Sequence, residues 1–180
     1  MTAWRKLGSE EVFWHPLFAL ERQIVASGDQ RKEVIVVKAP DWINVIPVLS
    51  DGRVVLIRQW RYGISAPCLE IPGGMVDADE NADEAAAREL LEETGYHARK
   101  MQELGVTHPN PAILSNRLTT YLATDLDLVE PEREEFGVDD EHITVEPTPM
   151  SEIPGLIREG AITHSLVVAA FHLLEVERGQ

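Results

Sequence analysis

One long helix-forming segment, residues 80–95, stands among segments that favour β-strands. ENADEAAARELLEETG is rich in the good helix formers Ala, Glu and Leu, and it stops at Gly95, which readily adopts the left-handed conformation of a helix end. Strands are expected before and after this helix, and two more helices close the chain. The later elements are expected at 118–123, 142–147, 151–160 and 163–177. This order predicts a mixed α/β sandwich rather than a doubly wound sheet.

An N-terminal hairpin is expected ahead of the main domain. FALERQIVA, residues 18–26, and EVIVVKA, residues 33–39, are apolar runs separated by the turn-prone SGDQ. Pro40 ends the second run. We therefore divide the chain into a β-rich N-terminal segment, residues 1–39, and a main domain, residues 40–180.

A second hairpin is expected at the start of the main domain. DWINVIPVL, residues 41–49, and RVVLIRQW, residues 53–60, flank Asp51 and Gly52. An Asp-Gly pair between two β-branched runs is a strong hairpin signal, so we expect both strands to pair within the core sheet. CLEIPGG then predicts a short strand that ends in a glycine loop directly before the helix. The later helix at 151–160 is expected to be short and interrupted by Pro154.

Charge and composition limit the function classes. The chain of 180 residues carries 16 Lys and Arg against 31 Asp and Glu, a formal charge of -15, which disfavours nucleic acid and acidic membranes as partners. Its single cysteine, Cys68, excludes an internal disulfide framework and a cysteine-built zinc site. No apolar run approaches a membrane span and the N-terminus lacks a secretory apolar core, so we expect a cytoplasmic protein.

Three carboxylates crowd the last turns of the expected helix. Glu89, Glu92 and Glu93 fall within an arc of roughly 100° at helical spacing. Acidic groups at this end oppose the helix dipole at a cost of about 0.3 to 1 kcal/mol each, and Glu89 and Glu93 repel each other. The helix has no Lys, and Arg88 is its one basic residue. A solvated face is the ordinary interpretation, but oxygen ligands without lysines also suit a hard cation such as Mg²⁺.

The segment GMVDADENADEAAARELLEETGY, residues 74–96, resembles the signature of the Nudix hydrolases. Tyr96 stands where that family more often has an aliphatic residue, a difference that touches packing rather than chemistry. A motif with this many specified positions is far more specific than a lone glycine motif. The matching positions are Gly74, Glu80, Arg88, Glu89, Leu90, Glu92, Glu93 and Gly95.

The resemblance implies a fold and a metal site. The fold would be a Nudix-type mixed-sheet α/β/α sandwich with an extra N-terminal β-hairpin or sheet. Mg²⁺ or Mn²⁺ would bridge enzyme and diphosphate, with Glu89 and Glu93 as principal ligands and Glu92 as a further ligand or its support. The backbone carbonyl of Gly73 would supply another oxygen. Arg88 would orient the acids through ion pairs and Glu80 would anchor the preceding loop.

Other features are similar to the ADP-ribose and nucleoside-diphosphate-sugar branch of that family. Arg58 and Arg61 lie on the strand before LEIPGG, and Pro111 lies 15 residues beyond Tyr96. With Trp42, they are the candidate substrate-binding residues, although each could equally serve packing or turns. In this branch the N-terminal sheet commonly joins two subunits, so a homodimer is expected.

One departure from the family pattern leaves the substrate open, and the general base has several candidates. Where related sugar-nucleotide enzymes often have an acid near the last helix, this chain has Thr163 and His164. For His108 and His164 we favour ordinary loop and cap positions over positions in a site. The branch typically takes its general base from a glutamate on a late loop. This chain has several acidic residues between Glu130 and Glu141. Among them we favour Glu141, because it directly precedes an expected strand.

The sequence therefore favours Mg²⁺-dependent hydrolysis of a nucleoside-diphosphate sugar to nucleoside monophosphate and sugar phosphate. Three alternatives remain at this point. They are a Nudix enzyme for a dinucleoside polyphosphate or dinucleotide cofactor, a sensor that binds ADP-ribose without turnover, and an interaction protein with an acidic helix.

Overall fold

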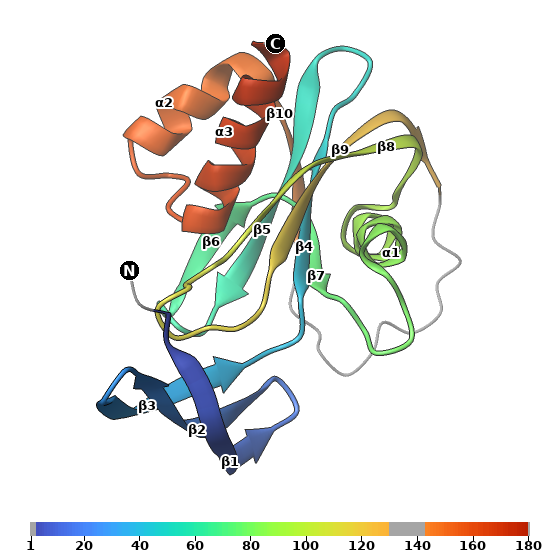
Figure 1. The fold of residues 1–180 in the computed structure, drawn as a ribbon. Coiled ribbons are helices and arrows are strands. Elements are labelled where there is room, and N and C mark those ends of the chain that lie inside the picture. The colour runs from blue at the N-terminus through green and yellow to red at the C-terminus, as the bar shows by residue number, and fades with distance from the viewer. Residues whose placement is uncertain (1–2, 130–142, 180) are drawn as a thin grey trace. The chain divides into compact units, whose positions relative to one another are not determined.

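The computed structural model describes residues 3–129 and 143–179 (Figure 1). The chain separates into two compact units. The first comprises Met1–Asp41 with Thr107–Leu118, and the second comprises Trp42–Val106 with Thr119–Gln180. The domain boundary between residues 39 and 40 stays a prediction, and the first unit also takes in a segment from later in the chain.

The first unit is built on a three-stranded antiparallel sheet in the order β1-β2-β3. The expected hairpin is confirmed by β2, Phe18–Ser27, and β3, Gln30–Lys38. β1, Arg5–His15, was not expected, because its sequence RKLGSEEVFWH lacks strict alternation and the strand is exposed along its whole length. In the same unit, Arg117 pairs with Asp41, with 3.2 Å between Nε and Oδ2.

Two sheets supply the strands of the second unit. One has the order β7-β4-β9-β8 and the other the order β10-β5-β6. Their strands are β4 Trp42–Pro47, β5 Arg53–Arg61, β6 Ala66–Glu70, β7 Gly73–Met75, β8 Tyr96–Thr107, β9 Leu118–Leu128 and β10 Thr144–Pro149.

The turn at Asp51 and Gly52 forms as expected, but the predicted pairing of the two strands that flank it within one sheet is wrong. Val48 and Val54 form one isolated antiparallel bridge, after which β4 and β5 enter different sheets. Both strands are almost continuously buried; β4 pairs with β7 and β9, and β5 pairs with β6, which follows it directly, and with the distant β10. A local turn signal cannot specify those distant partners.

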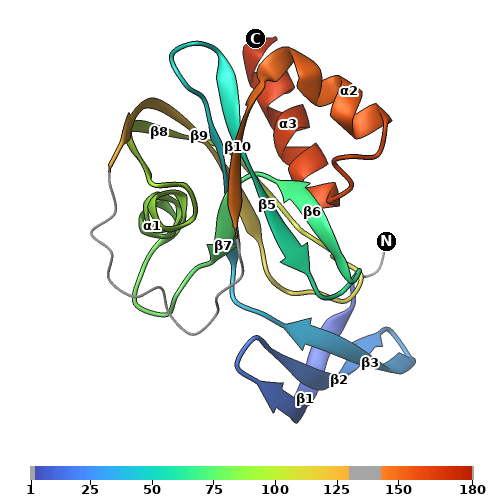
Figure 2. The same cartoon turned by 180° about the vertical axis from the view of Figure 1, so that it is seen from behind.

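Three α-helices complete the second unit, as expected. They are α1 Ala82–Thr94, α2 Ile153–Arg158, which follows a 3₁₀ turn η1 at Met150–Glu152, and α3 Ser165–Arg178. Pro154 lies in the first turn of α2, so it begins that helix rather than interrupting it. Figures 1 and 2 show α1 on one side of the strands and α2 with α3 on the other.

The strand β4 contributes to an apolar core on each of its faces. Ile43 and Val45 pack with Ala86 and Leu90 of α1, whereas Ile46 belongs to the core that includes Phe171 of α3. This alternation explains why β4 reads as a continuous apolar run. The mixed α/β/α sandwich is therefore confirmed. Within residues 3–129 and 143–179, none of the helices has the length and apolar character needed to cross a bilayer.

Candidate active site

The ends of α1 are set by local capping. Asn81 accepts hydrogen bonds from the backbone N–H groups of Asp83 and Glu84, and the Glu84 side chain accepts from the backbone of Asn81, which completes a capping box. At the other end Gly95 has φ 72° and donates its N–H to the carbonyl of Leu91. The acidic last turns of α1 therefore have a defined position.

The glycines of β7 allow close approach of two neighbouring elements. A Cβ at Gly73 would lie 2.5 Å from the carbonyl oxygen of Ile43, and a Cβ at Gly74 would lie 2.2 Å from Oε1 of Glu89. The N–H of Gly73 donates to Oε2 of Glu93 at 2.9 Å. β7 thus lies directly against the two carboxylates of α1.

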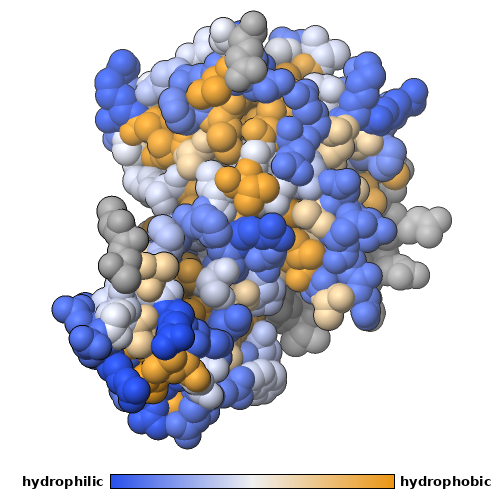
Figure 3. All heavy atoms as spheres, viewed as in Figure 1, coloured by the Kyte–Doolittle hydropathy of each residue, from blue (hydrophilic) through white to orange (hydrophobic). Residues whose placement is uncertain are grey.

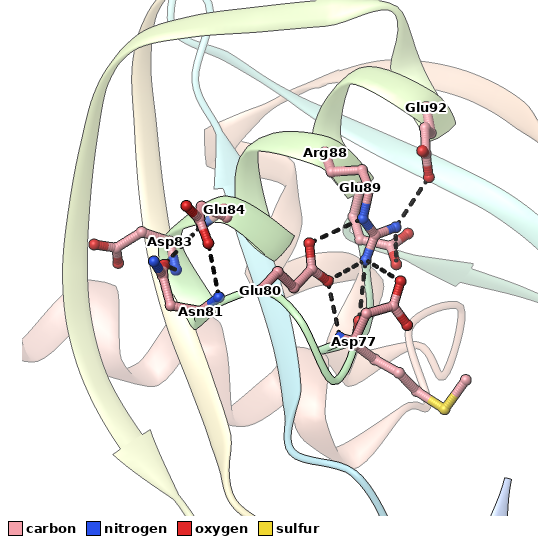
Figure 4. Close-up of polar contacts among 9 residues, drawn as sticks. Asp77, Glu80, Asn81, Asp83, Glu84, Arg88, Glu89 and Glu92 are labelled. Atoms are coloured by element: carbon pink, nitrogen blue, oxygen red, sulfur yellow. Dashed lines mark hydrogen bonds and ion pairs between the residues drawn. The ribbon is translucent and has the colours of Figure 1, made fainter.

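Arg88 gathers the surrounding carboxylates (Figure 4). Its Nη1 donates to Glu89 at 2.9 Å and to Glu92 at 3.1 Å, while Nη2 donates to Glu80 at 2.6 Å. The guanidinium holds the pKa of the Glu80 carboxyl below its ordinary value. In this arrangement Glu92, which is largely exposed, turns toward Arg88.

Glu89 and Glu93 are partly buried acids whose carboxyl groups are shielded from solvent by the surrounding packing. Burial raises the pKa of Glu89 although the charge of Arg88 opposes the rise. Burial also raises the pKa of Glu93 to about 8; the hydrogen bond from Gly73 opposes this shift and repulsion from Glu89 adds to it. The two carboxylates are therefore costly to hold ionised unless a positive charge joins them.

The donor chemistry of this cluster fits a divalent cation. Carboxylate oxygens are the preferred ligands of Mg²⁺ and Mn²⁺, and the raised pKa values of Glu89 and Glu93 indicate a need for opposite charge. In the described part of the chain, no three acidic, imidazole or thiol side chains converge as ligands in the present side-chain positions. Arg88 instead engages Glu89 and Glu92.

A second charged cluster, which sequence reasoning missed, lies at the end of β6. The side chain of Glu70 is 3% exposed and accepts two hydrogen bonds from Arg61, at 2.8 Å from Nε and 2.7 Å from Nη2. His164 Nδ1 lies 2.9 Å from Oε2 of the same carboxyl. Burial alone would raise the pKa of Glu70, but these contacts lower it to about 2. Glu70 belongs to the LEIPGG segment described above. It lies 94 residues from His164 in the sequence, so no local pattern predicts the contact between them.

The remaining predicted residues lie in different places. Arg58 makes a two-pronged pair with Glu146 of β10, at 2.6 and 3.0 Å. Trp42 is half-buried on β4, opposite Met75 of β7. Pro111 is exposed and belongs to the first unit, and Glu141 lies outside the described residues. Their substrate and catalytic roles stay predictions.

These layers and the acidic helix against a Gly-Gly strand define an α/β/α protein with a carboxylate-based site. A family model, the NUDIX domain, matches residues 40–171, and the chain belongs to this family. The resemblance seen in residues 74–96 is thereby confirmed.

Several curated relatives carry related names. An ADP-ribose pyrophosphatase of Bacillus subtilis (strain 168) is 31% identical over 99 residues, which cover 55% of this chain and 54% of that protein. An ADP-ribose pyrophosphatase of Mycobacterium tuberculosis is 28% identical over 167 residues, covering 91% and 79%. The ADP-sugar pyrophosphatase of Mus musculus is 38% identical over 96 residues, covering 48% and 41%. The match thus spans about half the length of the first of these relatives.

A solved structure described as an ADP compounds hydrolase superposes with a TM-score of 0.86. The comparison covers 100% of this chain and 97% of the other at 24% sequence identity. At that identity the similarity establishes the fold.

Proposed function

We propose that the protein hydrolyses the diphosphate of ADP-ribose or a related nucleoside-diphosphate sugar to nucleoside monophosphate and sugar phosphate. The observation that carries the proposal is the pair of partly buried carboxylates, Glu89 and Glu93, held against the Gly73–Gly74 strand with raised pKa values. Perturbed, closely spaced acids of this kind are typical of functional sites. The names of the B. subtilis, M. tuberculosis and mouse relatives support the substrate class.

Glu89, Glu93 and Glu92 would hold Mg²⁺ or Mn²⁺, with the Gly73 carbonyl as a further oxygen. When bound, such a cation neutralises diphosphate charge and makes a water more acidic. The chain's own part is to orient these oxygens. Arg88 steadies Glu89 and Glu92, and the Gly73 N–H fixes one oxygen of Glu93.

Arg58 and Arg61 are the proposed diphosphate-binding side chains. Each is partly exposed, and each is fixed by a two-pronged carboxylate pair, with Glu146 and Glu70 respectively. A guanidinium held in this way keeps its planar donor geometry and needs little ordering when a phosphate arrives. Trp42 and Pro111 are proposed to contact the nucleoside or sugar.

Glu141 is proposed as the general base. The Glu141→Gln variant should lower kcat by about 10² to 10⁴ with little change in KM, because a base acts in the transition state. Glu134→Gln and Glu135→Gln, which remove the same charge from the same acidic stretch of sequence, should be nearly silent. Steady-state kinetics on the three variants decide the assignment. Retention of more than about a third of the wild-type kcat by Glu141→Gln would exclude this residue as the base.

The first experiment is a hydrolysis panel. ADP-ribose, ADP-glucose, GDP-mannose, a dinucleoside polyphosphate and a dinucleotide cofactor are incubated with the protein and Mg²⁺ or Mn²⁺, and the products are separated. We expect nucleoside monophosphate from a sugar nucleotide and none after excess chelator. Faster turnover of the polyphosphate or cofactor would select the alternative Nudix substrates. Binding of ADP-ribose without turnover would select the sensor.

A further inference from the structure

Glu70 links His164, at the start of α3, to Arg61, at the end of β5. Its carboxyl is almost fully buried, and both of its oxygens are engaged. Oε1 accepts from Arg61 Nε, and Oε2 accepts from Arg61 Nη2 and faces His164 Nδ1. Because an ionised carboxylate can only accept hydrogen bonds, Nδ1 of His164 must carry the proton.

The position of His164 is set by the start of α3. Its carbonyl accepts from the N–H groups of Val167 and Val168, so the residue begins the helix, while its ring turns to β6 rather than capping α3. Leu166, two residues on, accepts a hydrogen bond from the side chain of Asn44 on β4. The backbone that carries the ring is therefore tied to the sheet.

Arg61 receives its orientation from this buried carboxyl. The Arg61 side chain is 41% exposed, and an exposed arginine left to itself would sample many rotamers. The pair with Glu70 restricts it, and the charge of Arg61 also opposes the rise in the pKa of Glu93. The charge of Arg61 therefore acts both on Glu70 and on Glu93 of α1.

We infer that His164 is a positioning residue, which through its hydrogen bond to Glu70 holds the guanidinium of Arg61 in the orientation that receives the substrate diphosphate. The ring adds a hydrogen bond to a buried carboxylate that Arg61 and the Cys68 thiol also contact, and its loss weakens the hold on Oε2 and loosens the Glu70–Arg61 pair. The consequence for substrate rests on the proposed function, whereas the consequence for Arg61 does not.

The variants separate this role from helix capping. Ser and Asn both cap helices well, which offsets the stability lost with the ring contact, so His164→Ser and His164→Asn should both remain folded. Only Asn also presents an N–H donor at about the reach of Nδ1. His172→Ser, on the exposed face of the same helix, is the matched control, since its ring lies 3.8 Å from Glu175 and away from β6.

The first measurement is hydrogen exchange of the Arg61 Nε–H by NMR, which needs no substrate. Exchange should be at least about tenfold faster in His164→Ser than in the wild type, corresponding to loss of one charge-assisted hydrogen bond, and near the wild-type rate in His164→Asn and His172→Ser. Unchanged exchange in His164→Ser would overturn the inference even if the protein hydrolyses nucleotide sugars.

The second measurement is kinetic. His164→Ser should raise KM for the best sugar nucleotide about tenfold with kcat within about threefold, and His164→Asn should restore it. In an Arg61→Lys background, which keeps the charge but loses the two-pronged pair, the effect of His164→Ser should largely vanish. An equal effect in both backgrounds would mean a structural role and would overturn the inference. If the wild type turns over no substrate, the proposed function fails while the exchange result still decides the role of His164.

Discussion

At the scale of single residues, Glu93 sets the character of the acidic site. It is partly buried at the carboxyl end of α1, where the helix dipole is negative, and Glu89 lies four residues before it. Its carboxylate accepts a hydrogen bond from the Gly73 N–H. An ionised carboxylate in this position destabilises the fold unless an opposite charge joins it. We therefore assign Glu93 a functional role.

The variant Glu93→Gln tests that assignment. It should lower kcat at least about a hundredfold, as expected for loss of a preorganised charged group, and leave the protein as stable as the wild type or more so. Glu159→Gln, an exposed position with the same charge change, is the control. The measurements are steady-state kinetics and thermal unfolding. A variant that unfolds yet keeps its specific activity would show that Glu93 is structural.

Glu70 gives the protein an acid-sensitive contribution to stability. Its folded-state pKa of about 2 lies below the ordinary value of 4.5, so the folded state favours the ionised form. The contribution is complete above about pH 4.5 and is lost as pH falls from there toward about 2; it is of order 3 kcal/mol. Urea unfolding at about pH 5 and about pH 3 should show a smaller loss of stability in Glu70→Gln than in the wild type. An identical loss in both would contradict the low pKa.

At the scale of elements, the spacing between β7 and α1 decides whether the acids can meet a ligand. The capping box at Asn81 and the left-handed Gly95 set where α1 begins and ends. Gly74 then leaves the space that the Glu89 carboxylate occupies. The strand and the helix therefore fit so closely that one added methyl group would displace the Glu89 carboxylate.

Gly74→Ala should therefore lower activity by at least about tenfold, because the added Cβ would displace the Glu89 carboxylate. The matched control is Gly63→Ala, where the added Cβ meets nothing within 4 Å. Hydrolysis rates and thermal unfolding of both variants provide the test. Full activity in Gly74→Ala would show that Glu89 can move without consequence.

At the scale of the whole molecule, the β1–β3 sheet presents an exposed apolar face. Register places Phe13 opposite Leu20 and Ile35 opposite Arg22, so Phe13, Ile24 and Ile35 share one face of the sheet. All three are exposed. Apolar side chains are visible on this sheet in Figure 3. We propose that a second copy of the chain covers this face, in a homodimer.

The double variant Ile24→Lys/Ile35→Lys should convert the dimer into a folded monomer, because two lysines cannot be buried in an apolar interface without a large desolvation cost. Asp29→Lys, at the turn between β2 and β3, is the control and should remain dimeric. Light scattering gives the mass and circular dichroism the fold. A wild-type protein that is already monomeric, or a double variant that stays dimeric, would exclude this interface.

The sequence by itself determined the elements whose signals are local. α1 could be predicted because its Ala, Glu and Leu content and its C-terminal glycine fall within residues 80–95. The β2–β3 hairpin and the turn at Gly52 depend on equally local chemistry. Glu89, Glu92 and Glu93 could be grouped without a structure, since one helix carries all three.

Only the tertiary structure decided which distant segments meet. The pairing of β4 with β9 and of β5 with β10 joins segments far apart in the chain, and non-local pairing leaves no local pattern to recognise. The same reason hid the contact between Glu70 and His164, which are 94 residues apart. The burial that raises the pKa of Glu93 likewise comes from packing around the helix, and spacing along the helix cannot reveal it.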